Sequence, residues 1–299
     1  DGAVRAIPAA HELVVCTDTL VAGVHFPLET SAGAIGWKAL AVNLSDLAAM
    51  GATPAWATLA LTLPSADAVW IEAFADGFAA LAGDYKLALV GGDTTRGPLA
   101  ATVTAHGFVP EGRALRRAGA RPGDLVFVTG TLGDAAAGLA CLDRSHARAA
   151  ALLAAPAALR EQAIARLERP TPRIAHGLAL RDLASACIDV SDGLVADLGH
   201  ICAASGVGAE IELDRLPASS ALLGLFEAEA RAAFQLAGGD DYELCFCIPP
   251  IHVERAADEL ARLGGGITRI GRIVESDGVC VLDGDGREIA VPRGWEHFA

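Results

Sequence analysis

Apolar and polar residues follow two distinct patterns over the first part of the chain, up to about residue 110. Short apolar runs predict strands, whereas stretches with an apolar residue at every third or fourth position predict helices. Gly51, followed by Pro54, is expected to end the first helix, and Ser65 is expected to cap the second. We expect strands at 13–17, 56–63, 86–90 and 100–108, and helices at 35–50 and 69–81. This alternation indicates an α/β unit.

The segment EGRALRRAGARPGD, residues 111–124, interrupts this pattern. It combines several arginines with Gly and Pro in an otherwise acidic chain, which is typical of an exposed connector. A chain of 299 residues is also long for one domain, so two are expected. We therefore divide the chain into an N-terminal domain, residues 1–112, and a C-terminal domain, residues 113–299.

The second domain shows the same mixture of patterns. Apolar runs in DLVFVTG, in ACIDVSDG and after GGDDYE predict strands, and two short strands are expected around the turn DGDGRE. Helical patterns are expected at 131–142, within 147–165, after DVSDG and at 252–263.

Composition narrows the possible functions. The net charge of −14 argues against a nucleic-acid partner, because phosphate backbones are bound by clustered Lys and Arg. No apolar run approaches the roughly 18 residues of a membrane helix, and no signal peptide is visible, so we expect no membrane association and a cytoplasmic location. The first residue is Asp1 rather than Met, so this expectation covers only the residues given.

The numbers of lysines and cysteines narrow the chemistry that the chain can support. Lys38 and Lys86 are the only lysines, so phosphates would be met by Arg, by backbone N–H groups or by metal ions. The seven scattered cysteines do not suggest structural disulfides. Cys245 and Cys247 share one face of a predicted strand, which favours packing in the core over metal binding.

Carboxylates recur beside Gly, Ser or Thr where predicted strands end. Asp46 differs because it lies inside an apolar helix, where an ionised carboxylate is costly unless a positive charge meets it. Strand ends on one edge of an α/β sheet collect ligands, so these acids are expected to converge around divalent metal, with Mg²⁺ the natural candidate. The strand-end acids are Asp18, Asp93, Asp189, Asp192 and Asp240.

The stretch LVGGDTTRG suggests how phosphates would be held. Its glycines are expected to let the backbone approach a ligand, while Asp93 binds a metal in place of the lysine of a phosphate-binding loop. Simpler alternatives remain open: an Asp beside Gly is usually a turn residue, and SDG before a helix can be a cap. His25 is either a core histidine or a substrate contact. The chain contains no Walker loop, no G-x-S-x-G elbow and no H-E-x-x-H zinc motif.

Taken in order, the motifs CTDTLVAGVHF, NLSDLAAMGATPAWATLALTLP, GGDTTRGPL, DVSDGLVADLGHI and GGDDYELCF closely resemble the thiamine-monophosphate kinase family. This family belongs to the superfamily of aminoimidazole-ribonucleotide synthetase, and the resemblance covers essentially the whole chain. It implies a two-domain fold of the α/β (α+β) class, with N-terminal domains that pair into a β-barrel at the interface of a homodimer. It also implies ATP-dependent phosphorylation of thiamine phosphate to thiamine diphosphate, with several Mg²⁺ ions, and leaves a role for K⁺ open.

The resemblance assigns roles to particular residues. Arg117 and Asp93 would act on the transferring phosphoryl group, although Arg117 is alternatively a solvated arginine of the connector. The implied magnesium ligands are Asp1, Thr17, Asp18, Asp46, Asp93, Asp189 and Asp192. The implied ATP contacts are Gly92, Asp93, Arg117 and Ser191. The implied thiamine-phosphate contacts are His25, Asp240 and Trp295, the last of which is alternatively a C-terminal packing residue.

Two positions depart from the family pattern. Cys16 stands where relatives can have Ser, and a thiol would be a poor magnesium ligand, although the backbone carbonyl there would serve. Asp240 stands where relatives can have Glu, and the shorter side chain is expected to reach a cationic or hydroxyl group. The alternatives to the kinase are another ATP-dependent member of the superfamily, such as selenophosphate synthetase, or a non-catalytic maturation factor.

Overall fold

The computed structural model describes residues 2–264 and 266–291. Contacts between residues divide the chain into two compact units. Unit 1 comprises Asp1–Ala114 and Glu168–Leu178, and unit 2 comprises Leu115–Leu167 and Ala179–Ala299. The inclusion of Glu168–Leu178 in unit 1 is not anticipated by the sequence pattern.

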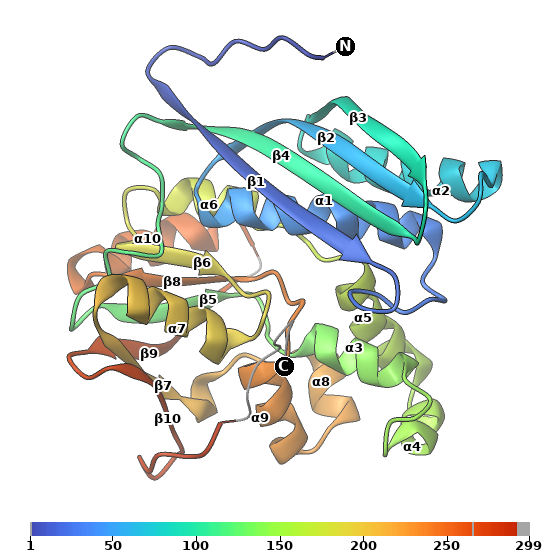
Figure 1. The fold of residues 1–299 in the computed structure, drawn as a ribbon. Coiled ribbons are helices and arrows are strands. Elements are labelled where there is room, and N and C mark those ends of the chain that lie inside the picture. The colour runs from blue at the N-terminus through green and yellow to red at the C-terminus, as the bar shows by residue number, and fades with distance from the viewer. Residues whose placement is uncertain (1, 265, 292–299) are drawn as a thin grey trace. The chain divides into compact units, whose positions relative to one another are not determined.

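Unit 1 is a four-stranded mixed sheet with two long helices (Figure 1). The strands follow the order β1-β4-β2-β3, in which β2 pairs parallel with β3 and antiparallel with β4, and β1 pairs antiparallel with β4. The elements are β1 (His11–Val21), α1 (Ala32–Ala49), β2 (Thr53–Leu63), α2 (Ala68–Asp84), β3 (Ala88–Arg96) and β4 (Ala100–Pro110).

The start of α2 and the end of β3 differ from the sequence-based prediction. The cap of α2 is Asp67, not Ser65: its carboxylate accepts hydrogen bonds from Val69 N (3.0 Å) and Trp70 N (3.2 Å). Strand β3 does not stop at Val90 but continues through Arg96, because its residues pair with β2 as far as Leu63. The GGDTT motif therefore lies within an edge strand, where a loop was expected.

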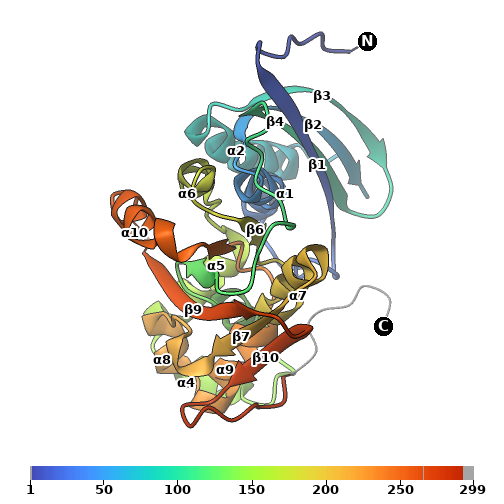
Figure 2. The same ribbon diagram turned by 90° about the vertical axis from the view of Figure 1, so that its left-hand side faces the viewer.

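The helices of unit 1 pack on one face of its sheet (Figure 2). Helix α1 is buried along most of its length and contacts β1, β4 and α2. The segment after Glu168 joins this layer through two hydrogen bonds, from Trp37 Nε1 to Pro170 O (2.9 Å) and from the Tyr85 hydroxyl to Pro172 O (2.8 Å). These bonds explain why a segment distant in sequence belongs to unit 1.

Unit 2 is built on a six-stranded sheet in the order β10-β7-β9-β5-β8-β6. Its strands are β5 (Leu125–Thr129), β6 (Ala186–Asp189), β7 (Gly208–Glu212), β8 (Leu244–Ile248), β9 (Ile267–Val274) and β10 (Gly278–Leu282). Its helices are α3 (Asp134–Leu142), α4 (Ala149–Ala154), α5 (Ala157–Glu168), α7 (Leu194–Ser205), α8 (Ser220–Leu225), α9 (Ala228–Ala237) and α10 (Val253–Ala261). Helix α6 (Ile174–Leu180) spans the boundary between the units. Pro156 separates α4 from α5 because proline disfavours continuation of a helix.

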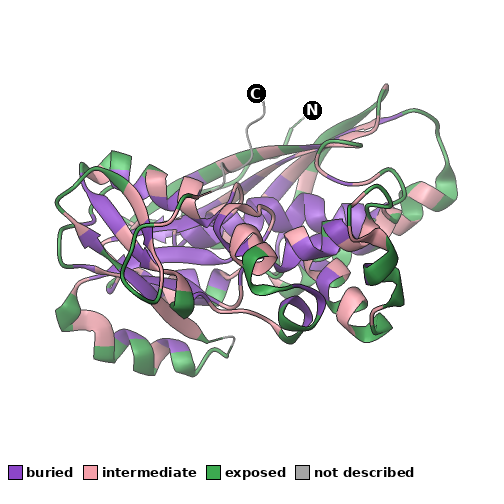
Figure 3. Ribbon diagram, turned by 90° about the horizontal axis from the view of Figure 1, so that it is seen from below, coloured by how far each residue is buried: buried purple, intermediate pink, exposed green. Residues whose placement is uncertain are grey.

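One core cluster of unit 2 lies between its sheet and α7, and another lies among α3, α4, α5 and α8. Cys245 and Cys247 are fully buried in β8 and belong to the first cluster, which confirms their packing role. Buried residues are purple in Figure 3, where they mark the central strands and the inner faces of the helices. Within the residues that the structure describes, no helix combines the length and apolar character needed to cross a membrane.

Candidate active site

Two of the predicted acids lie in the layer between β1 and α1. Cys16 of β1 faces α1, since its Sγ lies 3.3 Å from Asn43 O and donates a weak hydrogen bond to it. Asp18 is two residues further along the same face of β1, and Asp46 is three residues beyond Asn43 in α1. Both are half-buried. The apolar surroundings expected for Asp46 are confirmed, because Leu44 and Leu47 are fully buried.

Asp93 is separated from Asp18 by the order of the strands. Asp18 pairs with Val103 of β4, whereas Asp93 pairs with Ala60 of β2 at the other edge of the sheet. Three strand spacings lie between β1 and β3, or about 14 Å, which is too far for one ion to bind both carboxylates. Asp93 is also exposed. Within one chain, therefore, unit 1 does not bring its three aspartates together.

Gly92 has a structural reason to be glycine. Its φ is +149°, and a Cβ there would lie 1.8 Å from Leu59 O of the neighbouring strand. The close approach that we expected toward a ligand is thus an approach between the backbones of β2 and β3. Gly91, in contrast, would meet only the Thr58 methyl group, at 3.9 Å.

His25 and Thr17 already have partners within unit 1. The Nδ1 atom of His25 accepts a hydrogen bond from Val21 N (3.0 Å), and its carbonyl accepts one from Lys38 Nζ (3.2 Å). The first bond holds the imidazole at the end of β1, and the second holds the backbone of His25. The Thr17 hydroxyl donates to Thr104 Oγ1 (2.9 Å) on the face opposite α1, so its backbone carbonyl is the more suitable metal ligand.

In unit 2, the residues of the DVSDG motif form a short loop between β6 and α7. Asp189 is the last residue of β6 and is buried, while Ser191 and Asp192 are half-buried in the loop. The alternative interpretation of SDG as a helix cap is confirmed in position, because Gly193 is the N-cap of α7. No side chain of the motif makes a cap hydrogen bond to this helix.

Asp197, in the first turn of α7, holds this loop in place. Its Oδ2 accepts hydrogen bonds from Ser191 N and Asp192 N, both at 3.0 Å. Burial raises the pKa of Asp197 to about 7, and the nearby charge of Asp189 adds to the rise. The sequence pattern did not single out Asp197, although an acid that reaches back from a first helical turn is a known capping arrangement.

The GGDDYE motif is bonded directly to the DVSDG loop. Asp240 N donates to Ser191 O (2.8 Å), and Tyr242 N donates to Val190 O (2.8 Å). In return, Val190 N donates to Glu243 O (2.7 Å). The resemblance assigns Ser191 to ATP and Asp240 to thiamine phosphate, and the backbone of unit 2 holds these two residues next to each other.

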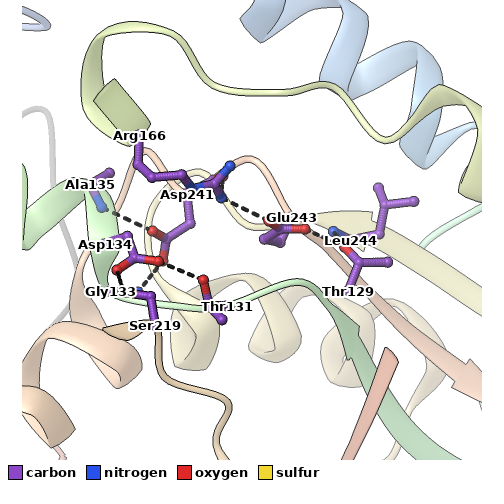
Figure 4. Close-up of polar contacts among 10 residues, drawn as sticks. All are labelled: Thr129, Thr131, Gly133, Asp134, Ala135, Arg166, Ser219, Asp241, Glu243 and Leu244. Atoms are coloured by element: carbon purple, nitrogen blue, oxygen red, sulfur yellow. Dashed lines mark hydrogen bonds and ion pairs between the residues drawn. The ribbon is translucent and has the colours of Figure 1, made fainter. Parts of the chain in front are cut away.

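We call the DVSDG loop and the GGDDYE motif together the double loop. A buried polar network joins the double loop to α3, β5 and α5 (Figure 4). The Asp241 carboxylate accepts hydrogen bonds from Gly133 N (2.6 Å) and Ala135 N (3.2 Å) at the beginning of α3. Burial raises the pKa of Asp241 to about 8, while the N–H group of Gly133 opposes part of this rise. The carboxylate satisfies N–H groups that the first turn of a helix leaves without intrahelical partners.

Glu243 forms the other half of the network. Its carboxylate accepts hydrogen bonds from Thr129 Oγ1 (2.6 Å) and from Arg166 (2.7 Å), so the buried charge is paired. Arg166 also donates to Asp241 O (3.2 Å). The sequence did not predict Asp241, Glu243, Thr129 or Arg166 as site residues. Their hydrogen bonds hold the GGDDYE motif against β5, α3 and α5.

Three assigned residues receive no clear role from the described contacts. Arg117 is exposed, with its carbonyl 3.3 Å from Ser205 Oγ, so both of its interpretations stay open. Asp1 and Trp295 lie outside the described residues.

Comparison with known families identifies the class of protein to which this architecture belongs. The family described as AIR synthase related protein, N-terminal domain, matches residues 1–109, and the corresponding C-terminal domain family matches residues 121–283. A structure of the hydrogenase maturation protein HypE from E. coli shares the fold, with 23% identity and a TM-score of 0.74 over 94% of this chain and 87% of that chain. The chain thus has the two-domain architecture of AIR synthase related proteins.

More similar relatives define the particular family. The thiamine-monophosphate kinase of Escherichia coli strain K12 is 50% identical over 301 residues, which cover 100% of this chain and 90% of that protein. The crystal structure of thiamine-monophosphate kinase from Stenotrophomonas maltophilia K279a has 52% identity and a TM-score of 0.89, covering 97% of this chain and 90% of that chain. AaThiL complexed with AMPPCP and TMP has 35% identity and a TM-score of 0.82, covering 98% of this chain and 89% of that chain. The chain belongs to the thiamine-monophosphate kinase family and is a phosphotransferase.

Proposed function

We propose that this kinase transfers the γ-phosphoryl group of ATP directly, by in-line displacement, to the phosphate of thiamine phosphate. A bond forms between an acceptor phosphate oxygen and the γ-phosphorus, the bond from that phosphorus to the β-phosphate oxygen breaks, and thiamine diphosphate and ADP leave. The acceptor is already an ionised oxygen, so the reaction needs alignment and charge neutralisation more than a general base. The observation that supports this most strongly is the full-length likeness to AaThiL, which was solved with AMPPCP, an ATP analogue, and TMP.

The carboxylates of both units have the donor chemistry that suits Mg²⁺. Among the residues that the structure describes, no group of three or more His, Cys, Asp or Glu is placed to hold an ion. Mg²⁺ usually takes one or two protein carboxylates and completes its shell with water and phosphate oxygens. Bound Mg²⁺ would neutralise charge on the phosphates. The proposed ligands are Thr17, Asp18, Asp46 and Asp93 in unit 1, Asp189 and Asp192 in unit 2, and Asp1.

The remaining residues are proposed to bind and orient the two substrates. Ser191, with its backbone fixed by Asp197, contacts ATP together with Gly92, and Arg117 stabilises charge on the transferring group. His25, Asp240 and Trp295 contact thiamine phosphate. A K⁺ requirement and the cytoplasmic location stay predictions.

The activity itself is tested by incubating the purified protein with ATP, Mg²⁺ and thiamine phosphate. We expect thiamine diphosphate and ADP to form in equal amounts, and product formation to stop when EDTA removes the metal. ATP hydrolysis that does not depend on thiamine phosphate, without formation of thiamine diphosphate, would instead favour one of the alternatives, which are another ATP-dependent member of the superfamily and a maturation factor.

We further propose a homodimer in which the two N-terminal sheets close into a β-barrel. The face of the unit 1 sheet opposite α1 carries apolar side chains: Val15 is 51% exposed, and half-buried Trp56 lies against His106 and Phe108. Strands β1 and β3 form the two edges of this sheet, and eight of the nine residues of β3 are exposed. A two-fold axis along the barrel would pair β1 of one chain with β3 of its partner, which removes both open edges. That pairing would also carry the partner's Asp93 toward Asp18.

The dimer is tested by sedimentation analysis of the parent and of two matched variants. We expect the parent to have twice the 30.5 kDa mass of one chain. Val15→Asp is expected to shift the protein toward monomer, because it places a charge on the face that the barrel would bury. Val69→Asp, at a 77% exposed position of α2, serves as the control and should leave the mass unchanged. A monomeric parent, or equal behaviour of the two variants, would rule out this interface.

A further inference from the structure

The segment Asp240–Tyr242 has an unusual backbone. Asp240 has φ +67° and Tyr242 has φ +50°, so two residues with side chains occupy the left-handed region on either side of Asp241. For a bulky residue such as Tyr this conformation is rare, and it persists only where the surrounding structure enforces it.

The surroundings of this segment do enforce it. Asp240 N and Tyr242 N donate to the DVSDG loop, and the buried carboxylate of Asp241 between them accepts from two N–H groups of α3 (Figure 4). Each of the three residues is therefore fixed by at least one backbone or buried hydrogen bond. Strain that is maintained in this way is a feature of sites where a side chain must be presented in one orientation.

The strained backbone turns the Tyr242 side chain back onto Asp240. The Tyr242 hydroxyl donates a hydrogen bond of 2.8 Å to Asp240 Oδ1. Tyr242 is 7% exposed, whereas Asp240 is half-buried, so a buried phenol donates the hydrogen bond to a carboxylate that is partly accessible to solvent. The hydroxyl group that we expected the short Asp240 side chain to reach is thus supplied by the protein itself.

We propose that Tyr242 is a positioning residue for thiamine phosphate, which fixes the Asp240 carboxylate in the orientation that binds the substrate. This inference rests on the proposed role of Asp240. A carboxylate that accepts a hydrogen bond from a buried phenol is restricted in its rotation, so the bond favours one orientation of Asp240 toward the substrate. The thiazolium ring of thiamine phosphate carries a permanent positive charge, which a preoriented carboxylate complements.

The test is a double-mutant cycle with a matched control. The variants are Tyr242→Phe, Asp240→Ala, the double variant, and Tyr85→Phe. Tyr85 is the only other tyrosine, and its hydroxyl also makes a 2.8 Å hydrogen bond, but to Pro172 O in unit 1. The Michaelis constants for thiamine phosphate and for ATP, kcat and the thermal midpoint are measured for each protein.

We expect Tyr242→Phe to raise KM for thiamine phosphate about tenfold and to leave KM for ATP unchanged. Tyr85→Phe should change neither constant. In the Asp240→Ala background, Tyr242→Phe should have no further effect, because the group through which it acts is gone.

Several results would overturn the proposal. Tyr242→Phe with an unchanged KM for thiamine phosphate would do so, as would an equal rise of both Michaelis constants with a lowered thermal midpoint, which marks a purely structural role. An effect of the same size with and without Asp240, or an Asp240→Ala variant with normal KM, would also overturn it. A parent enzyme that does not phosphorylate thiamine phosphate would refute the proposed function together with this inference, whereas an active parent with an unaffected Tyr242→Phe would refute only the inference.

Discussion

Asp93→Ala is expected to lower kcat for thiamine-diphosphate formation at least a hundredfold, which corresponds to a barrier increase of about 2.7 kcal/mol. The reason is that the proposed role of Asp93 is to hold Mg²⁺ against the phosphates, where the loss of one charged ligand affects the transition state directly. The thermal midpoint should not change, because Asp93 is exposed on β3. Stopped assays at saturating ATP and thiamine phosphate, together with a thermal unfolding curve, measure both quantities.

The control for Asp93→Ala is Asp76→Ala, which removes another exposed carboxylate, from α2. It should retain the activity of the parent. Activity of Asp93→Ala within about tenfold of the parent, about 1.4 kcal/mol, would contradict a metal-binding role for this residue.

Mixed dimers would show which chain supplies Asp93. Asp18 and Asp93 lie at opposite edges of one sheet, so in the proposed barrel each site combines Asp18 of one chain with the partner's Asp93. Asp18→Ala and Asp93→Ala would each be inactive alone, but a dimer with one chain of each would regain one intact site. Recovery of activity after the two variants are unfolded and refolded together is the expected result. No recovery, with mixed dimers demonstrated by mass, would place both residues in one site of a single chain.

The predicted acids lie near Gly, Ser or Thr in the sequence, although Asp18 and Asp93 lie inside β1 and β3 and not at strand ends as expected. Local patterns of this kind predict Asp18, Asp93, Asp189, Asp192 and Asp240 as candidate site residues. They did not show that Asp18 and Asp93 lie at different edges, because strand order depends on pairings between distant segments.

The supporting residues were missed for a related reason. Asp241 binds the N-terminus of α3, which lies 106 to 108 positions earlier in the chain, and nothing in the neighbouring sequence indicates this contact. Glu243 likewise depends on Thr129 and Arg166. A carboxylate that is buried and bonded through long-range contacts looks, in the sequence, like any other charged residue near a strand.

Two glycines in the helices of unit 1 also have roles that depend on contacts between segments distant in the sequence. Gly36 and Gly77 lie inside predicted helices, where glycine lowers helix propensity by roughly 1 kcal/mol relative to alanine, and the sequence offers no reason for them. In the structure, a Cβ on Gly36 would lie 2.0 Å from Phe74 O, and one on Gly77 would lie 1.9 Å from Gly33 O. The backbones of α1 and α2 touch at these positions, so the glycines permit the packing of the layer that carries Asp46.

Gly77→Ala is therefore expected to destabilise the protein strongly, by about 3 kcal/mol or more in the free energy of unfolding. The added methyl group meets backbone atoms, which cannot rotate away as a flexible side chain can. Gly83→Ala, in the same helix, is the matched control, because a Cβ there has no heavy atom within 4 Å. It should be neutral or slightly stabilising, since alanine favours the helix. Urea unfolding monitored by tryptophan fluorescence compares the two variants, and a Gly77→Ala protein as stable as Gly83→Ala would show that the helices can separate at little cost. Because α1 holds Asp46 and is in contact with β1, such freedom would also remove the physical basis for a fixed metal site in this layer.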